Sequence, residues 1–304
     1  MALMECVPNF SEGRDTAVIA ALAAELASVS GAHLLDQSQD PSHHRCVFTL
    51  AGEPAAVAEA AVQAVGKAAE LIDLTRHLGE HPRIGAADVV PFVPLHNISL
   101  EECAIWAHWT GQQIWRRWRI PVYFYEAAAS RPERRQLENI RRGGFEALLA
   151  GAWLDPYRRP DLGAAPHPAA GSVAVGARPL LIACNINLAT ADQAIARQIA
   201  RAIRASSGGL PAVKALGLRL RDPDQAQVSM NLTDFRQTGL YDVWRRVSQL
   251  ARDLGTAAVE TELIGLIPRA ALAAGDPAEL RIHGWNPNMI LEERLQKAGL
   301  HLPL

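Results

Sequence analysis

The chain has 304 residues, of which 49% are hydrophobic and 20% charged, and its formal net charge is −2. This composition is typical of a globular protein, and it excludes a strongly basic nucleic-acid-binding surface and an acidic tail. No apolar stretch reaches the ~18 residues of a membrane-spanning helix. The N-terminus has no signal-peptide features, so we expect a cytoplasmic protein that binds neither membrane nor nucleic acid.

The first half of the chain predicts the element order βαββαβ. Apolar residues at Val18, Leu22 and Leu26 recur at helical spacing, whereas the other segments alternate with turn-prone stretches. The predicted elements are a strand at 3–10, a helix at 15–29, strands at 33–36 and 45–52, a helix at 54–71 and a strand at 88–95.

The middle of the chain predicts two helices, a strand and an irregular stretch. Ser99 and Glu102 have capping-box spacing and mark the start of the first helix. The second helix is expected despite Gly143 and Gly144. The predicted bounds are 99–117 and 134–149 for the helices, 120–125 for the strand and 151–178 for the irregular stretch, which is either functional or a linker.

The second half repeats the βαββαβ order, with Thr190 and Gln193 as a second predicted capping box. Its predicted elements are strands at 179–188, 212–220, 226–232 and 257–267 and helices at 190–205 and 241–254. Two such units predict an α+β protein with tandem ferredoxin-like (βαββαβ) subdomains at 1–178 and 179–304. A ligand cleft is expected between them.

The four cysteines are Cys6, Cys46, Cys103 and Cys184, and no two have CxxC spacing. That spacing is typical of structural zinc sites and redox sites. We therefore expect free thiols.

The stretch HLGEHPRIGAADVVPF, residues 77–92, raises three alternatives. His77, Glu80 and His81 match H-x-x-E-H, a zinc motif that works only on a helix. Gly79 and Pro82 disfavour a helix, so we expect no bound metal. The other two alternatives are an ordinary polar loop and a proton-transfer site in which a carboxylate orients an imidazole. The residues alone leave these two open.

This stretch and ECVPNFSEG (5–13) together resemble the formiminotransferase family, the glutamate formimidoyltransferases that are free-standing in bacteria and fused to a cyclodeaminase in animals. Further matching segments lie at 121–125, 176–188, 226–235 and 262–268. The resemblance implies two ferredoxin-like subdomains in a homodimer. It also implies transfer of the formimino group of N-formiminoglutamate to N5 of tetrahydrofolate, which is a co-substrate.

The resemblance makes His81 the catalytic general acid and base, and His77 either an orienting neighbour or a structural residue. The orienting or substrate-binding candidates are Glu80, Arg83, Asp88, Asn9, Ser11, Glu12 and Arg45. The folate-binding candidates are Gly163, His167, Pro168, Gly171, Arg178, Asn185 and Asn187. The arginines among them are suited to bind carboxylates. The alternative for the segment 161–171 is a linker, and the two asparagines could equally face solvent.

The sequence departs from the family pattern in two places, and several rival functions remain open. Residues 42–45 read SHHR where bacterial members commonly read DHNR, and the segment after Asp276 lies outside the matching segments. His44 could therefore alter substrate choice. The rivals are a transferase with another donor, such as formiminoglycine or 5-formyltetrahydrofolate, a folate-binding protein without turnover, and a zinc hydrolase.

Overall fold

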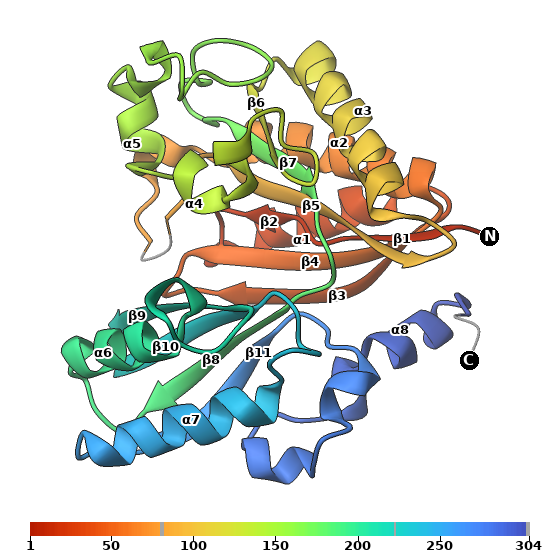
Figure 1. The fold of residues 1–304 in the computed structure, drawn as a ribbon. Coiled ribbons are helices and arrows are strands. Elements are labelled where there is room, and N and C mark those ends of the chain that lie inside the picture. The colour runs from red at the N-terminus through yellow and green to blue at the C-terminus, as the bar shows by residue number, and fades with distance from the viewer. Residues whose placement is uncertain (80–81, 222, 302–304) are drawn as a thin grey trace. The chain divides into compact units, whose positions relative to one another are not determined.

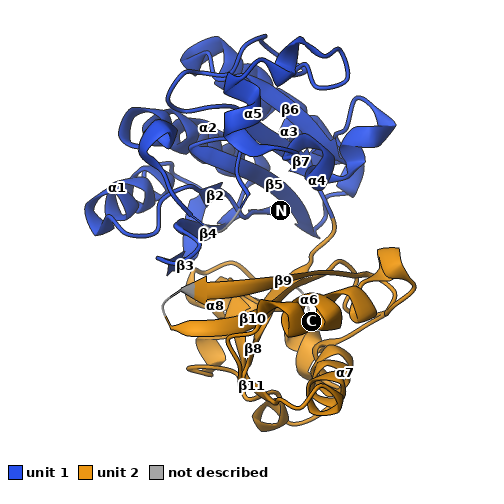
Figure 2. Cartoon of the chain, turned by 90° about the vertical axis from the view of Figure 1, so that its left-hand side faces the viewer, with its two compact units in different colours: residues 1–178 blue, residues 179–304 orange. Residues whose placement is uncertain are grey.

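The computed structural model describes residues 1–79, 82–221 and 223–301 (Figure 1). The chain divides into two compact units, Met1–Arg178 and Pro179–Leu304 (Figure 2). Each unit contains one β-sheet with helices packed on it, so the predicted α+β class is confirmed.

Unit 1 contains a seven-stranded sheet. Its strands are β1 (Leu3–Cys6), β2 (Asn9–Phe10), β3 (Ala32–Asp40), β4 (Arg45–Gly52), β5 (Ala87–His96), β6 (Val122–Glu126) and β7 (Val173–Ala177). The short strands β1 and β2 both pair with β4 on one side and β5 on the other, and β3 pairs with the outer side of β4. β7 extends the sheet beyond β5 in parallel, and β6 pairs in parallel with β7.

Helices cover both faces of this sheet. α1 (Thr16–Ala27), α2 (Pro54–Leu71) and α3 (Leu100–Trp118) pack on one face, where they enclose the main apolar core of the unit. The shorter α4 (Leu137–Ile140) and α5 (Gly144–Leu149) contribute to a smaller cluster that includes Val89 of β5, Tyr123 and Tyr125 of β6 and Ala174 of β7. Because successive strand residues point to opposite faces, both faces of these three strands are buried.

Unit 2 contains a four-stranded antiparallel sheet in the order β11-β8-β10-β9. Its elements are β8 (Ile182–Leu188), α6 (Gln193–Ile203), β9 (Val213–Arg221), β10 (Asp224–Leu232), α7 (Leu240–Asp253), β11 (Ala258–Ile264) and α8 (Leu291–Lys297). α6 and α7 pack on one face and bury Ile186, Val228 and Trp244. Short 3-10 turns and α8 follow β11.

Three local predictions need correction. The helix expected at 134–149 is broken into η2 (Pro132–Arg135), α4 and α5, because Gly143 and Gly144 adopt positive φ angles of 76° and 66°. The stretch expected to be irregular contains β7, a short strand buried on both faces that has no alternating pattern to reveal it. The helix expected from Thr190 begins at Gln193, because the carboxylate of Asp192 accepts the N–H of Ala194 at 2.8 Å.

The capping box predicted at the start of α3 is confirmed. Ser99 Oγ accepts the N–H of Glu102 at 3.1 Å, and Glu102 Oε2 accepts the N–H of Ser99 at 2.7 Å. All four cysteines are buried free thiols, as expected.

Candidate active site

The loop that contains the predicted catalytic histidine starts from η1 (Leu74–Arg76) and runs to β5. Glu80 and His81 themselves lie outside the described residues. The described flanks are firmly held, because His77 Nε2 donates to the carbonyl oxygen of His44 at 2.9 Å and Arg83 Nη2 donates to that of His77 at 3.0 Å. A Cβ added to Gly79 would lie 2.5 Å from the carbonyl oxygen of His43, so only glycine fits here without a shift.

The second wall of the site is the turn between β3 and β4. The Asp40 carboxylate accepts the backbone N–H groups of Ser42 and His43 at 2.8 and 2.9 Å and also pairs with His43 Nδ1. The next residue, His44, has a φ of 52°, a conformation that few side chains other than Asn, Asp and His adopt. This turn directs the His44 ring onto the ring of His77, with 4.1 Å between ring centroids.

His77 is a neutral, structural imidazole. Its side chain is buried, and a carbonyl oxygen can only accept, so Nε2 carries the hydrogen. The pKa of His77 is lowered to about 4, chiefly by burial and also by the charges of His44 and Arg83, although the hydrogen bond to the His44 carbonyl acts to raise it. A group with this pKa is a weak base at neutral pH, which favours a supporting role over proton transfer.

Glu12 connects the segment after β2 to the same turn. Its Oε1 accepts the N–H groups of Arg14 and Asp15 at 2.7 and 2.9 Å and lies 3.1 Å from His44 Nε2. Burial acts to raise the pKa of Glu12, but these hydrogen bonds and the charge of His44 outweigh it, so the pKa is lowered. A carboxylate at this position therefore fixes the orientation of His44.

Ser11 and Asp88 hold the loop just after the predicted catalytic residue. Ser11 Oγ donates to the carbonyl oxygen of Gly85 at 2.7 Å. Asp88 is buried, and its carboxylate accepts the N–H of Ile84 at 2.8 Å and pairs with Arg141. Both Asp88 oxygens are thus engaged within the protein, and Asp88 holds the loop.

These side chains surround a small cavity of about 10 Å³, roughly the space of one water molecule. Its lining consists of Phe10, Ser11, His43, His44, Arg45, His77, Arg83 and Asp88. The structure thus brings together Ser11, Arg45, Arg83 and Asp88, four of the residues predicted from sequence. Asn9 does not line the cavity, and its side chain donates to the carbonyl oxygen of Val7 at 2.9 Å.

Arg83 is the predicted carboxylate partner nearest the predicted catalytic histidine in sequence. Its guanidinium pairs with the Glu146 carboxylate at 2.8 Å, and its buried Nε has no hydrogen-bond partner among the described residues. Part of its donor capacity therefore remains for a bound anion.

Residues 167–171 of the predicted folate loop lie beside this site. His167 and Gly171 exchange two backbone hydrogen bonds of 2.8 and 2.9 Å, and His167 Nδ1 accepts the N–H of Ala170 at 2.9 Å. This tight turn pairs with the segment after Pro82, since Ala86 N–H donates to Ala170 at 2.9 Å. A Cβ on Gly171 would lie 2.1 Å from the carbonyl oxygen of Ile84, so this glycine is required for the close approach.

The other predicted folate residues lie elsewhere. Gly163 packs near Trp115 and Pro121, where α3 ends and β6 begins. The backbone N–H of Arg178 donates to the carbonyl oxygen of Phe92 at 3.0 Å. Asn185 and Asn187 belong to unit 2, on the sheet face opposite α6 and α7. Unit 1 by itself therefore gathers only the 167–171 part of the predicted set.

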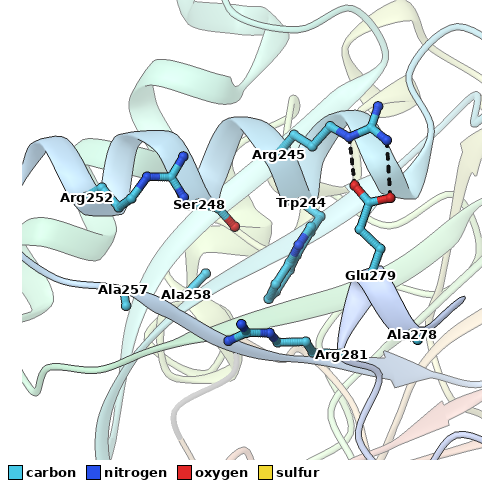
Figure 3. Close-up of a pocket in the computed structure, with 9 residues that line it drawn as sticks. All are labelled: Trp244, Arg245, Ser248, Arg252, Ala257, Ala258, Ala278, Glu279 and Arg281. Carbon is cyan, nitrogen blue, oxygen red and sulfur yellow. Dashed lines mark hydrogen bonds and ion pairs between the residues drawn. The ribbon is translucent and has the colours of Figure 1, made fainter. Parts of the chain in front are cut away.

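A larger cavity, of about 570 Å³, lies within unit 2 on the helix side of its sheet (Figure 3). Arg252 and Arg281 point into it beside Trp244, while Arg245 forms a two-point ion pair with Glu279 at 2.8 and 3.2 Å. The lining carries three guanidiniums and one carboxylate. Its chemistry is suited to anions, and sequence reasoning did not find it because its residues come from α7, β11 and the segment around residue 279.

Within residues 1–79, 82–221 and 223–301, no group of three or more His, Cys, Asp or Glu side chains is placed to hold a metal ion. None of the helices in the same ranges is both long and apolar enough to cross a membrane.

Comparisons with known proteins agree with the resemblance found in the sequence. Residues 3–178 match the family model described as "Formiminotransferase domain, N-terminal subdomain", and residues 183–294 match the model described as "Formiminotransferase domain". The boundary between the two matches falls at the boundary between the two units.

Similar proteins carry consistent names. A glutamate formimidoyltransferase of Thermoplasma acidophilum is 41% identical and spans 98% of this chain and 99% of its own length. One from Streptococcus pyogenes serotype M1 is 46% identical over 89% of this chain and 90% of its own. The formimidoyltransferase-cyclodeaminase of Gallus gallus is 44% identical over 92% of this chain but only 52% of its own length.

Proposed function

The chain belongs to the formiminotransferase family, and from this premise we propose that it transfers the formimino group of N-formiminoglutamate to N5 of tetrahydrofolate and releases glutamate. The observation that carries the proposal is the identity of 41% to a glutamate formimidoyltransferase along nearly the full length of both chains. We assign the reaction to the candidate active site of unit 1, whose loop leads to His81.

The proposed reaction needs two proton transfers and no covalent enzyme intermediate. N5 of the folate attacks the formimino carbon and forms a C–N bond, and the proton on N5 passes to His81. The same proton then reaches the glutamate nitrogen as its C–N bond breaks. One imidazole of near-neutral pKa can perform both steps.

Support for this assignment comes from the surroundings of the loop. His77 and Arg83 fix its two described flanks, Ser11 and Asp88 hold the backbone that follows, and Glu12 acts through His44. Well-supported flanks favour precise positioning of a catalytic group. In this scheme Glu80 orients His81, and Arg45 and Arg83 bind substrate carboxylates.

We assign folate binding to the 163–171 loop, including His167 and Pro168, together with Arg178 of unit 1 and Asn185 and Asn187 of unit 2. The backbone turn at 167–171, which packs beside Gly85, supports the first part of the assignment.

Three further proposals concern architecture and context. Both units are ferredoxin-like, which is supported by the unit 2 strand order β11-β8-β10-β9, that is, fourth, first, third and second strand. The protein acts as a cytoplasmic homodimer. It requires no metal ion, since the amidine is activated by proton transfer alone.

A donor screen tests the proposal. The purified chain is incubated with tetrahydrofolate and, separately, formiminoglutamate, formiminoglycine or formiminoaspartate, and with 5-formyltetrahydrofolate plus glutamate. We expect turnover with formiminoglutamate at a kcat/KM at least tenfold above the others. Faster reaction with another donor would reassign the substrate, and folate binding without turnover for any donor would leave a binding protein.

A further inference from the structure

The face of the unit 2 sheet opposite α6 and α7 carries a polar strip, defined here as the buried Asn185, Asn187 and Gln227 and the partly exposed Glu260 and Glu262. These residues alternate along β8, β10 and β11 with the apolar residues that face the helices. The register places them in two rows. Gln227, Asn187 and Glu260 are neighbours in one row, and Ser229, Asn185 and Glu262 in the other.

Hydrogen bonds connect the strip across the three strands. Asn185 Nδ2 donates to Glu262 Oε2 at 2.9 Å, and Asn187 Nδ2 donates to Glu260 Oε1 at 3.0 Å. Gln227 Nε2 donates to Asn187 Oδ1 at 3.0 Å and lies 3.5 Å from Glu262 Oε2. Each of the three amide groups therefore has at least one donor paired within the strip.

The strip is left with an excess of acceptors. Gln227 is 1% exposed, and its Oε1 has no hydrogen-bond partner among the described residues. Each carboxylate oxygen can accept more than one hydrogen bond, so Glu262 retains capacity beyond its bonds to Asn185 and Gln227. Glu260 is further occupied, because its Oε2 lies 3.0 Å from His283 Nδ1. An unpaired buried acceptor is unfavourable, and a ligand that donates to it would remove this penalty.

The charge of the strip decides which part of a substrate it suits. Its two carboxylates repel the carboxylates of formiminoglutamate and of the folate tail. The pterin ring is different, because its 2-amino group and N3–H form two parallel donors on one planar edge. A carboxylate accepts such a pair in the same two-point manner in which it binds a guanidinium.

We propose that the strip binds the pyrimidinone edge of the tetrahydrofolate pterin, with Glu262 as the two-point acceptor and Gln227 as an additional acceptor. The proposal rests on the proposed function. It assigns a specificity role to two residues of unit 2, Gln227 and Glu262, in addition to the predicted pair of asparagines. The arginine-lined cavity on the other side of the sheet (Figure 3) lacks this chemistry and supplies a control position.

The test compares binding of tetrahydrofolate with binding of its 2-desamino analogue, by calorimetry, for the wild type and Glu262→Gln. A site that hydrogen-bonds a substrate amine rejects the analogue that lacks it. We expect the wild type to prefer tetrahydrofolate by about 10–100-fold, the usual effect of a charge-assisted hydrogen bond. In Glu262→Gln this ratio should fall to about threefold or less, and KM for formiminoglutamate should change by less than about threefold.

Glu279→Gln is the matched control, because it makes the same chemical change in the same unit and should keep the wild-type ratio. Gln227→Met repeats the test at a second position should Glu262→Gln unfold, and it should weaken folate binding while thermal unfolding stays near that of the wild type. Retained discrimination in the strip variants, or a rise confined to KM for formiminoglutamate, overturns this proposal alone. A wild type that does not bind tetrahydrofolate overturns the proposed function as well.

Discussion

The imidazole rings of His44 and His77 are stacked, with their centroids 4.1 Å apart and their planes 8° apart. The same two residues are joined by the hydrogen bond from His77 Nε2 to the carbonyl oxygen of His44. His44 also lies 3.1 Å from the Glu12 carboxylate. One residue in a left-handed backbone conformation thus connects the β3–β4 turn, the segment after β2 and the loop that leads to His81.

Two substitutions of His44 should distinguish the contribution of its backbone conformation to stability from the contribution of its ring. His44→Ala loses the stack and the contact with Glu12 and strains a backbone with φ of 52°, so we expect a loss of about 2–3 kcal/mol in unfolding free energy. His44→Asn should cost about half as much, because asparagine tolerates this conformation. Urea unfolding measures both, with His301→Ala as the exposed control. Equal losses for the two variants would show that backbone conformation is not the deciding factor.

The buried imidazole of His77 should make stability depend on pH in acid. Its pKa is about 4 in the folded chain, against the ordinary histidine value of 6.5. The unfolded chain therefore binds more protons between these values. Stability should be complete above pH 6.5, fall as pH drops towards 4 and level off below that, with a total change of about 1–3 kcal/mol.

His77→Gln removes the titration and keeps a side-chain donor for the His44 carbonyl. The stability difference between the wild type and this variant should narrow as pH falls from 7 to 4. Chemical unfolding at half-unit pH intervals measures it. A difference that stays constant over this range would mean that His77 titrates normally.

The contribution of Glu5 to stability should depend on pH in the opposite sense to that of His77. Burial in β1 raises the pKa of Glu5 from 4.5 to about 7, although the charge of Arg178 lowers it in part. Its contribution to stability is therefore present below pH 4.5 and is lost as pH rises through 7. Glu5→Gln should match the wild type at pH 4.5 and exceed it by up to about 3 kcal/mol at pH 8. Glu133→Gln, at an exposed position, should show no such trend. A Glu5→Gln variant that is less stable at pH 8 would mean that the charged form is well compensated.

The sequence predicted those elements of the fold that have a repeating pattern. α1 and α2 follow apolar spacing, and α3 follows its capping box, so their positions could be predicted from local residues. The break in the helix predicted within residues 132–149 could not be predicted in this way, because it is determined by two adjacent glycines with positive φ. β7 was missed because its identity as a strand depends on neighbours β5 and β6, which are distant in sequence.

The site was predictable only in part for the same reason. Ser11, Arg83 and Asp88 stand in recognisable motifs, and the cavity lining contains all three. His44 was noticed only as a departure from the family pattern, since its stacking on His77 depends on a turn that no linear motif encodes. Only Asn185 and Asn187 of the strip were predicted from the sequence, because the register that aligns them with Gln227, Glu260 and Glu262 is set by the folded sheet.

The last prediction concerns His81, which we assign as the general acid and base. His81→Ala should fold and bind folate nearly as the wild type does, while kcat falls by about 10²–10⁴-fold, the usual contribution of such a group. The loss should appear in kcat more than in KM, because the proton transfers develop in the transition state. Glu80→Gln should cost less if Glu80 only orients the ring. His77→Ala should lower stability more than turnover, since a pKa of about 4 makes that ring a weak base.

The pH profile of kcat provides the independent check on His81. The wild type should show a limb near neutral pH, where an unperturbed histidine titrates, and this limb should be absent from the residual activity of His81→Ala. His301→Ala, which removes an exposed histidine, should leave both kcat and the limb unchanged. If His81→Ala keeps more than about a tenth of the wild-type kcat, well above the expected range, the assignment fails. His167 would then be the next histidine to test, because its turn packs against the same segment of unit 1, at Gly85 and Ala86.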